Sequence, residues 1–131
     1  MFLLDTNVCI YLMKNTFPEL TERVFSCSPT ELFISSVTVF ELEYGVAKSS
    51  RVEENHLKLL LFLAPFNIID FDSSDALIAG QIRHYLEKRG TPIGPYDIQI
   101  ASQGLARNMT VLTHNISEFS RVPNLKAEDW I

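Results

Sequence analysis

The sequence has no apolar segment long enough to cross a membrane. Its longest apolar run, residues 57–66, is interrupted by Lys58 and contains Pro65 near its end, whereas a membrane-spanning helix needs about 20 apolar residues. Asp5 interrupts the apolar start of the chain, and no basic stretch precedes that start, so we expect no secretory signal. The sequence therefore predicts a cytoplasmic protein that does not associate with membranes.

Cysteine and histidine are scarce. Cys9 and Cys27 are the only cysteines, and their spacing matches neither a zinc-ligand pair nor a C-x-x-C redox motif. We expect two buried free thiols, which is the usual state of unpaired cysteine. His56, His84 and His114 have no second histidine or cysteine at ligand spacing, so the sequence predicts no zinc site.

Positive charge is also in deficit. The chain has 11 Lys+Arg against 16 Asp+Glu, a formal net charge of −5, which argues against a protein that binds DNA through a simple basic patch. A nucleic-acid enzyme whose acidic residues are concentrated in a metal site stays compatible with this charge. The remaining composition is that of an ordinary globular chain, and the length predicts one domain spanning residues 1–131.

Short apolar segments alternate along the chain with segments of helical pattern. We expect strands at residues 2–4, 32–34, 66–71, 110–113 and near 126, and helices at residues 6–13, 20–25, 37–47, 54–63, 75–88 and 95–108, with a short turn at 115–119. Serines at 35–36 and the segment 73–75 are expected to cap the helices that follow them. The alternation predicts an α/β fold with a mostly parallel sheet covered by helices on both faces.

In such sheets, ligands bind beyond the carboxyl ends of the strands, and an acidic residue stands at the first of these ends. Asp5 directly follows the strand at residues 2–4. It is either a functional carboxylate or the N-cap of the next helix.

Two further acids come from distant parts of the chain. Glu41 shares a helical face with Val37 and Tyr44, and a carboxylate on an apolar face needs a metal or a cationic partner such as Arg or Lys. Asp97 lies in the first turn of the helix opened by Pro95, where the helix dipole also favours a negative charge.

Together these acids predict an oxygen-rich pocket. Oxygen ligands suit Mg²⁺ or Mn²⁺, which support phosphodiester hydrolysis by activating water. Thr113 and Asn115 follow the strand at residues 110–113 and can hold metal-bound waters or phosphate oxygens. Asn115 can equally cap the next turn.

Three motifs give the chain a family resemblance. Residues 5–7 (DTN) after an apolar strand, residues 41–45 (ELEYG) in a helix and residues 94–97 (GPYD) resemble the PIN-domain ribonucleases. More narrowly, residues 90–97, 118–123 and 128–130 resemble those of VapC toxins of bacterial type II toxin–antitoxin pairs. The resemblance covers essentially the whole chain and implies a PIN-like α/β/α sandwich with a central sheet of four or five strands.

The resemblance also implies an active site. It implies an endoribonuclease dependent on Mg²⁺ or Mn²⁺, with Asp5, Glu41 and Asp97 as catalytic metal-binding acids and with supporting side chains at Thr6, Thr113 and Asn115. Many family members have a fourth acid after the fourth strand, and that position here is Asn115. Glu118 corresponds to a different position, so we expect one well-bound metal and leave a second open.

Partners follow from the resemblance as well. It implies a homodimer that a small VapB-type antitoxin neutralises, with operator DNA bound only through the antitoxin. The helices at 6–13 and 37–47 would offer a groove for the antitoxin tail. The implied substrate is a structured RNA such as tRNA. The alternative is a non-catalytic PIN-like module that binds RNA or protein.

An acidic nuclease still needs cations for the RNA backbone. Arg83, Lys88 and Arg89 lie toward the end of a predicted helix that we expect to finish near the active-site edge. They are the first candidates for contacts with RNA phosphates.

Overall fold

A five-stranded sheet lies at the centre of the computed structural model, which describes residues 1–131. The strand order is β3-β2-β1-β4-β5, and every neighbouring pair is parallel. The strands are β1 (Phe2–Leu4), β2 (Leu32–Ser35), β3 (Asn67–Ile69), β4 (Thr110–Leu112) and β5 (Ala127–Glu128). The predicted α/β fold is confirmed, with a sheet that is parallel throughout.

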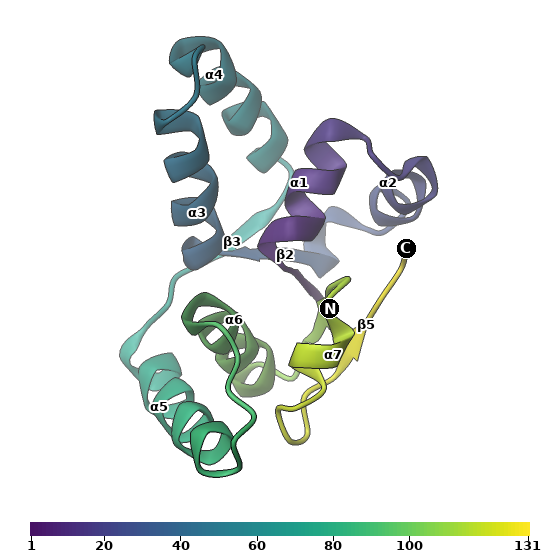
Figure 1. The fold of residues 1–131 in the computed structure, drawn as a ribbon. Coiled ribbons are helices and arrows are strands. Elements are labelled where there is room, and N and C mark those ends of the chain that lie inside the picture. The colour runs from purple at the N-terminus through teal and green to yellow at the C-terminus, as the bar shows by residue number, and fades with distance from the viewer.

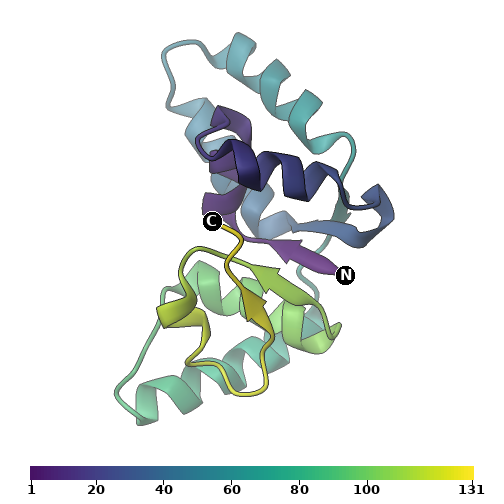
Figure 2. The same cartoon turned by 90° about the vertical axis from the view of Figure 1, so that its right-hand side faces the viewer.

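Helices cover both faces of this sheet (Figure 1). One face carries α1 (Thr6–Lys14), α2 (Pro18–Phe25), α3 (Ser36–Ala47) and α4 (Val52–Leu63), and the other carries α5 (Ser73–Lys88), α6 (Pro95–Ala106) and the short α7 (Ile116–Phe119). A 3₁₀ turn, Pro29–Glu31, precedes β2. The view turned by 90° shows the same two helical layers on either side of the strands (Figure 2). None of the seven α-helices combines the length and the hydropathy that membrane crossing requires.

Two apolar cores hold the layers together. Successive side chains of a strand point to opposite faces, so Leu3 and Val111 pack with α5 and α6, whereas Leu4 and Leu112 pack with α1 and α3. These four side chains are essentially inaccessible to solvent. The central strands are therefore apolar on both faces, and their polar chemistry is confined to the residues that follow them.

Several element boundaries differ from the sequence-based prediction. Helix α2 begins at Pro18 rather than residue 20, because proline suits the first helical position, where no backbone N–H is needed. The N-cap of α5 is Asp72, not one of the two serines that follow it. Helix α6 ends at Ala106, and Asn108 adopts the left-handed conformation (φ 52°). Cys27 is only partly buried, unlike the predicted buried thiol.

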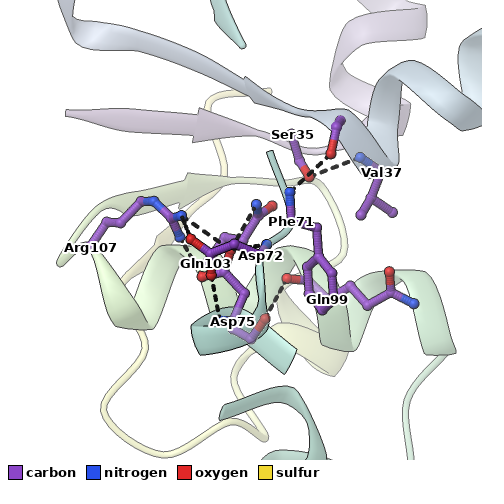
Figure 3. A network of polar contacts seen from close by, with 10 residues as sticks. Ser35, Val37, Phe71, Asp72, Asp75, Gln99, Gln103 and Arg107 are labelled. Carbon is purple, nitrogen blue, oxygen red and sulfur yellow. Dashed lines mark hydrogen bonds and ion pairs between the residues drawn. The ribbon is translucent and has the colours of Figure 1, made fainter. Parts of the chain in front are cut away.

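An ion-pair cluster fixes how α5 and α6 lie against each other (Figure 3). The Arg107 guanidinium at the end of α6 donates to both carboxylate oxygens of Asp75 in the first turn of α5, at 2.6 and 3.1 Å. Asp72 and Asp75 also form a reciprocal capping box. The start of α5 is thereby tied to the end of α6, so the end of α5 approaches the start of α6, where Asp97 lies.

Candidate active site

The candidate site lies in the middle of the sheet, where the order in which the chain adds strands reverses between β1 and β4. From β1 the chain continues to β2 on one side, whereas β4 is the neighbour of β1 on the other side. The backbone N–H of Asp5 donates to the carbonyl of Leu112 at 3.1 Å, which brings the ends of β1 and β4 together. Such switch points are the usual ligand sites of parallel α/β sheets.

Asp5 lies at the bottom of this site and is only 3% exposed. Its Oδ1 accepts a hydrogen bond of 2.8 Å from the backbone N–H of Val8, so Asp5 also caps α1. Burial raises the pKa of its carboxyl, and the charge of Glu41 adds to that rise, although hydrogen bonds from Thr113 and Val8 oppose it. The N-cap role and the functional role are thus compatible in one residue, because Oδ1 alone serves the cap.

Glu41 is held by hydroxyl groups rather than by a cation. The Thr6 hydroxyl donates to Oε1 of Glu41 at 2.6 Å, and the Thr6 and Thr38 hydroxyl oxygens lie 3.1 Å apart. Because the single Thr6 proton goes to Glu41, the Thr38 hydroxyl donates to Thr6. The Arg or Lys partner considered for Glu41 is not present, and a chain of two threonines orients the carboxylate instead.

Asp97 is crowded by other acids. It is partly buried in the first turn of α6. Burial and the nearby charges of Asp5, Glu118 and Glu41 raise the pKa of Asp97 to about 6, and a hydrogen bond shared with Glu118 adds to the rise. Four carboxyl groups therefore lie close together, and the like charges of the other three disfavour the ionised form of Asp97.

Glu118 is a further acid of the site, which the sequence did not assign to it. The family's fourth-acid position is occupied by Asn115, and Glu118 stands at a different position of the sequence, yet α7 places Glu118 beside Asp97. Asn115 orients it, with its side-chain amide donating to Oε2 of Glu118 at 2.9 Å. The available signal was the spacing of Asn115 and Glu118, three residues apart, which places them on one face of a helical turn.

Thr38 was also missed. Thr38 is fully buried and precedes Glu41 by about one helical turn, which is the pattern that could have revealed it.

Thr113 and Asn115, which were predicted as supporting residues, hydrogen-bond to acids of the site but do not line the cavity. The Thr113 hydroxyl accepts a hydrogen bond of 2.9 Å from the backbone N–H of Asn115. The Asn115 side chain makes no capping bond to α7; its amide donates to Glu118, and its oxygen accepts a hydrogen bond of 3.4 Å from Ser117.

The carboxylates of Asp5, Glu41 and Asp97 open into one cavity of about 200 Å³. Its lining is almost entirely polar and consists of Asp5, Thr6, Asn7, Glu41, Gly94, Pro95, Tyr96 and Asp97. Gly94 lies against Asp97 at the edge of the cavity, where a Cβ atom would be in ordinary van der Waals contact, 3.6 Å from Oδ2 of Asp97. The cavity can hold several waters or a hydrated ion.

The donor set fits a hydrated Mg²⁺ or Mn²⁺ ion. No lysine or arginine forms an ion pair with Asp5, Glu41, Asp97 or Glu118, so the negative charge is not compensated within the chain. No three His, Cys, Asp or Glu side chains are gathered closely enough to hold a metal by themselves. Mg²⁺ commonly binds through one or two carboxylates and completes its shell with water and substrate phosphate, which is the arrangement that this cavity allows.

The three candidate RNA-binding cations lie in or just beyond the last turns of α5. Arg83 lines a groove of about 520 Å³ next to the acid cavity, and Pro95 lines both. The Nε atom of Arg83 donates to Glu87 at 2.9 Å. The Arg89 guanidinium lies 5.2 Å from the centre of the Tyr85 ring. Lys88 forms no ion pair. The groove thus brings one of the three cations close to the acid cavity.

Comparisons with known proteins agree with one another. A model of the PIN domain matches residues 2–125. The chain is 41% identical over 129 residues to a Salmonella typhimurium protein named tRNA(fMet)-specific endonuclease VapC, covering 98% of this chain and 97% of that protein. It is 40% identical over 131 residues to Ribonuclease VapC2 of Rickettsia felis, covering 98% and 97%. The crystal structure of VapBC2 from Rickettsia felis bound to a DNA fragment from their promoter matches with a TM-score of 0.92 at 38% identity, covering 99% of this chain and 98% of that chain.

Proposed function

This chain belongs to the VapC ribonucleases of the PIN-domain family, and from that premise we propose that it is the toxin of a type II toxin–antitoxin pair that hydrolyses RNA phosphodiester bonds with a divalent metal ion. The observation that carries the proposal is the convergence of Asp5, Glu41 and Asp97 on one polar cavity without any cationic partner.

The acids would have different roles, which follow from their surroundings. Asp5 and Asp97 would hold Mg²⁺ or Mn²⁺ directly or through water, and Glu118 beside Asp97 would add a third carboxylate donor. A bound ion would supply charge stabilisation for the phosphate and would lower the pKa of a water that it binds. Glu41, held in place by Thr6 at 2.6 Å, would orient the water that attacks phosphorus. No side-chain nucleophile is needed.

The proposed substrate is tRNA or another structured RNA. The Salmonella typhimurium relative is named a tRNA(fMet)-specific endonuclease, and this chain aligns with it along nearly its whole length. The cations at the end of α5 would hold backbone phosphates while the scissile phosphate enters the acid cavity. Arg83 is the best placed, because its groove adjoins the cavity at Pro95.

The test is cleavage of purified tRNA and total RNA by the purified chain, freed of any bound partner. Reactions with Mg²⁺, with Mn²⁺ and with EDTA are compared for the wild type, Asp5→Asn, Asp97→Asn and the matched exposed variant Asp70→Asn. Cleavage that requires metal, is lost in the first two variants and persists in the third would support the proposal. A folded wild type that binds RNA and leaves it intact under all conditions would favour a non-catalytic binding module.

We further propose that an antitoxin tail occupies the groove between α1 and α3. That groove of about 520 Å³ is lined on its apolar side by Ile10, Met13, Leu42 and Val46. Glu41 lines both the groove and the acid cavity. An amphipathic segment in the groove would therefore end at the acids, where a basic side chain can block the site. DNA binding would come from the antitoxin, which agrees with the net charge of −5.

Antitoxin binding is tested with the cognate VapB-type protein. Met13→Asp places a charge in the groove and should raise the Kd for the antitoxin by roughly 10-fold or more, since an unpaired charge against apolar surface is costly. The matched control is Leu77→Asp on α5, which is 66% exposed and lies outside the groove. Equal affinities for the two variants would overturn the groove assignment while leaving the nuclease untouched.

A further inference from the structure

Two aromatic rings meet on the surface beside the acid cavity. Phe40 of α3 and Tyr96 of α6 pack edge to face, with ring centroids 5.6 Å apart and an angle of 74° between the ring planes. Phe40 is 54% exposed and Tyr96 is 41% exposed. Because so much of each ring faces solvent, burial in the core does not explain the pair.

The pair is linked by sequence and by geometry to the acids. Phe40 immediately precedes Glu41, and Tyr96 immediately precedes Asp97. Tyr96 itself lines the acid cavity. Two helices on opposite faces of the sheet thus each contribute one acid and one exposed aromatic ring, and the aromatic pair lies beside the cavity.

We propose that the Phe40–Tyr96 pair is a stacking platform for an unpaired nucleobase next to the scissile phosphate. Aromatic side chains bind single-stranded RNA by stacking on base faces, which every base offers. This inference rests on the proposed nuclease function and adds a substrate requirement. The cleaved position is single-stranded, because a base within a duplex is already stacked and cannot reach the platform.

The charge of the site gives a second reason for a non-ionic contact. Asp5, Glu41, Asp97 and Glu118 repel phosphate, and no cation of the chain is paired with them. Backbone contacts to RNA near the cavity are therefore weak until a metal is bound. Stacking does not depend on that charge balance, so it can hold the nucleotide in register beside the acids.

The experiment uses an unstructured RNA oligonucleotide that the wild type cleaves at one site, and a series in which each nucleotide around that site is made abasic in turn. KM and kcat are measured for the wild type, Tyr96→Leu, Phe40→Leu and Tyr96→Phe. The matched control is Phe25→Leu on α2, since Phe25 is 50% exposed and lies outside the cavity. The same molecules are examined by sedimentation to determine their oligomeric state.

We expect an abasic nucleotide at one position flanking the scissile bond to raise KM for the wild type by roughly 5- to 100-fold. Tyr96→Leu and Phe40→Leu should raise KM for the intact RNA by a similar factor and remove most of the abasic effect at that position. Tyr96→Phe, which keeps the ring, should retain the abasic effect at that position, and Phe25→Leu should behave like the wild type. This coupling between one base and one ring is what a merely structural role would not produce.

Two results would overturn the platform and leave the nuclease standing. One is an abasic nucleotide that raises KM for Tyr96→Leu and Phe40→Leu by as much as it does for the wild type. The other is a monomer–dimer shift in Tyr96→Leu and Phe40→Leu without any change in KM, which would assign the pair to an interface between two copies of the chain. Absence of metal-dependent cleavage by the wild type would instead contradict the proposed function itself.

Discussion

Thr6 and Glu41 are 35 residues apart in the chain, yet the threonine hydroxyl lies 2.6 Å from the glutamate carboxylate and donates to it. The contact joins the first turn of α1 to the second turn of α3 across the candidate site. Thr38 completes the arrangement by donating to the Thr6 oxygen at 3.1 Å. Glu41 is therefore fixed before any substrate arrives, by groups that carry no charge.

Removing this hydroxyl should impair the chemical step more than RNA binding. Thr6→Val keeps the shape of the side chain but cannot donate, so Glu41 loses its orientation. We expect kcat to fall by roughly 10-fold with KM nearly unchanged, as is common when a residue supporting an active-site carboxylate is lost. Steady-state cleavage of an RNA oligonucleotide at saturating Mg²⁺ measures both quantities.

Two variants make that comparison specific. Thr6→Ser retains the donor and should stay within about 2-fold of the wild-type kcat. Thr21→Val removes another threonine hydroxyl, one that donates to Asn15 outside the cavity, and should leave kcat unchanged. A Thr6→Val enzyme with wild-type kcat would show that Glu41 does not need this hydrogen bond.

The crowding of acids around Asp97 should destabilise the metal-free protein as pH rises. Its pKa is raised to about 6, chiefly by burial and by the charges of Asp5 and Glu118. Below pH 3.8 Asp97 is protonated whether the chain is folded or unfolded, so it does not lower the free energy of unfolding. Between about pH 4 and 6 the unfolded chain releases the proton first, and above pH 6 the full penalty applies.

Asp97→Asn removes that penalty and with it the metal-binding charge. In EDTA we expect the variant to be more stable than the wild type by about 1–2 kcal/mol at pH 7.5, after allowance for solvent screening, and by almost nothing at pH 4. Thermal unfolding at several pH values measures the difference. Mn²⁺ should raise the Tm of the wild type above pH 6 and have little effect on the variant. A stability difference that is independent of pH would contradict the assigned pKa.

The fold followed closely from the pattern of the sequence. The central strands are predicted correctly because they are apolar on both faces, as in Leu3–Leu4 and Val111–Leu112, and because an acid or a hydroxyl directly follows each pair. The errors fall at helix ends. There, a choice such as Asp72 over Ser73 as the N-cap depends on which side chain can also pair with Asp75, and local composition does not decide that.

The candidate site was partly visible in the sequence. Asp5, Glu41 and Asp97 can be picked out because each stands against an apolar background. Glu118 is marked in the sequence only by its spacing from Asn115, because its place beside Asp97 depends on how the short α7 folds and on the hydrogen bond from Asn115. Thr38 is marked in the sequence only by its place about one helical turn before Glu41, and its contact with Thr6 depends on how α1 and α3 pack in the fold. The expected homodimer stays a prediction.

A third prediction concerns Glu118 and tests whether this acid contributes to metal binding. Glu118→Gln keeps the contact with Asn115 possible but removes one negative charge next to Asp97. At pH 8, where Asp97 is ionised in any case, we expect the Mn²⁺ concentration for half-maximal cleavage to rise by roughly 10-fold. The control is Glu31→Gln, an exposed glutamate in the 3₁₀ turn. Identical metal titrations for Glu118→Gln and the wild type would remove Glu118 from the metal site.

The ion pair between Arg107 and Asp75 should matter for stability rather than for chemistry. Asp75 is 1% exposed and receives two guanidinium hydrogen bonds, the shorter at 2.6 Å. Asp75→Asn or Arg107→Met leaves a buried or partly buried partner unsatisfied, which should lower the free energy of unfolding by about 2–4 kcal/mol at pH 7. Arg51→Met, which breaks an exposed pair with Glu54 at 3.4 Å, should cost less than about 0.5 kcal/mol.

The acid limb of the unfolding profile distinguishes this ion pair from a simple packing effect. Burial alone would raise the pKa of Asp75, but the hydrogen bonds from Arg107, the Asp72 backbone and Gln103, together with the Arg107 charge, outweigh it and lower the pKa below its ordinary value of 3.8. The stabilisation is therefore complete above pH 3.8 and is lost as pH falls through the lower pKa of the folded state, because the folded carboxyl must then take up a proton. The stability difference between wild type and Asp75→Asn, measured by urea unfolding, should stay constant from pH 7 to 5 and shrink below pH 4. A difference that persists unchanged at pH 3 would mean that the shape of the side chain at position 75, rather than its charge, holds α5 against α6.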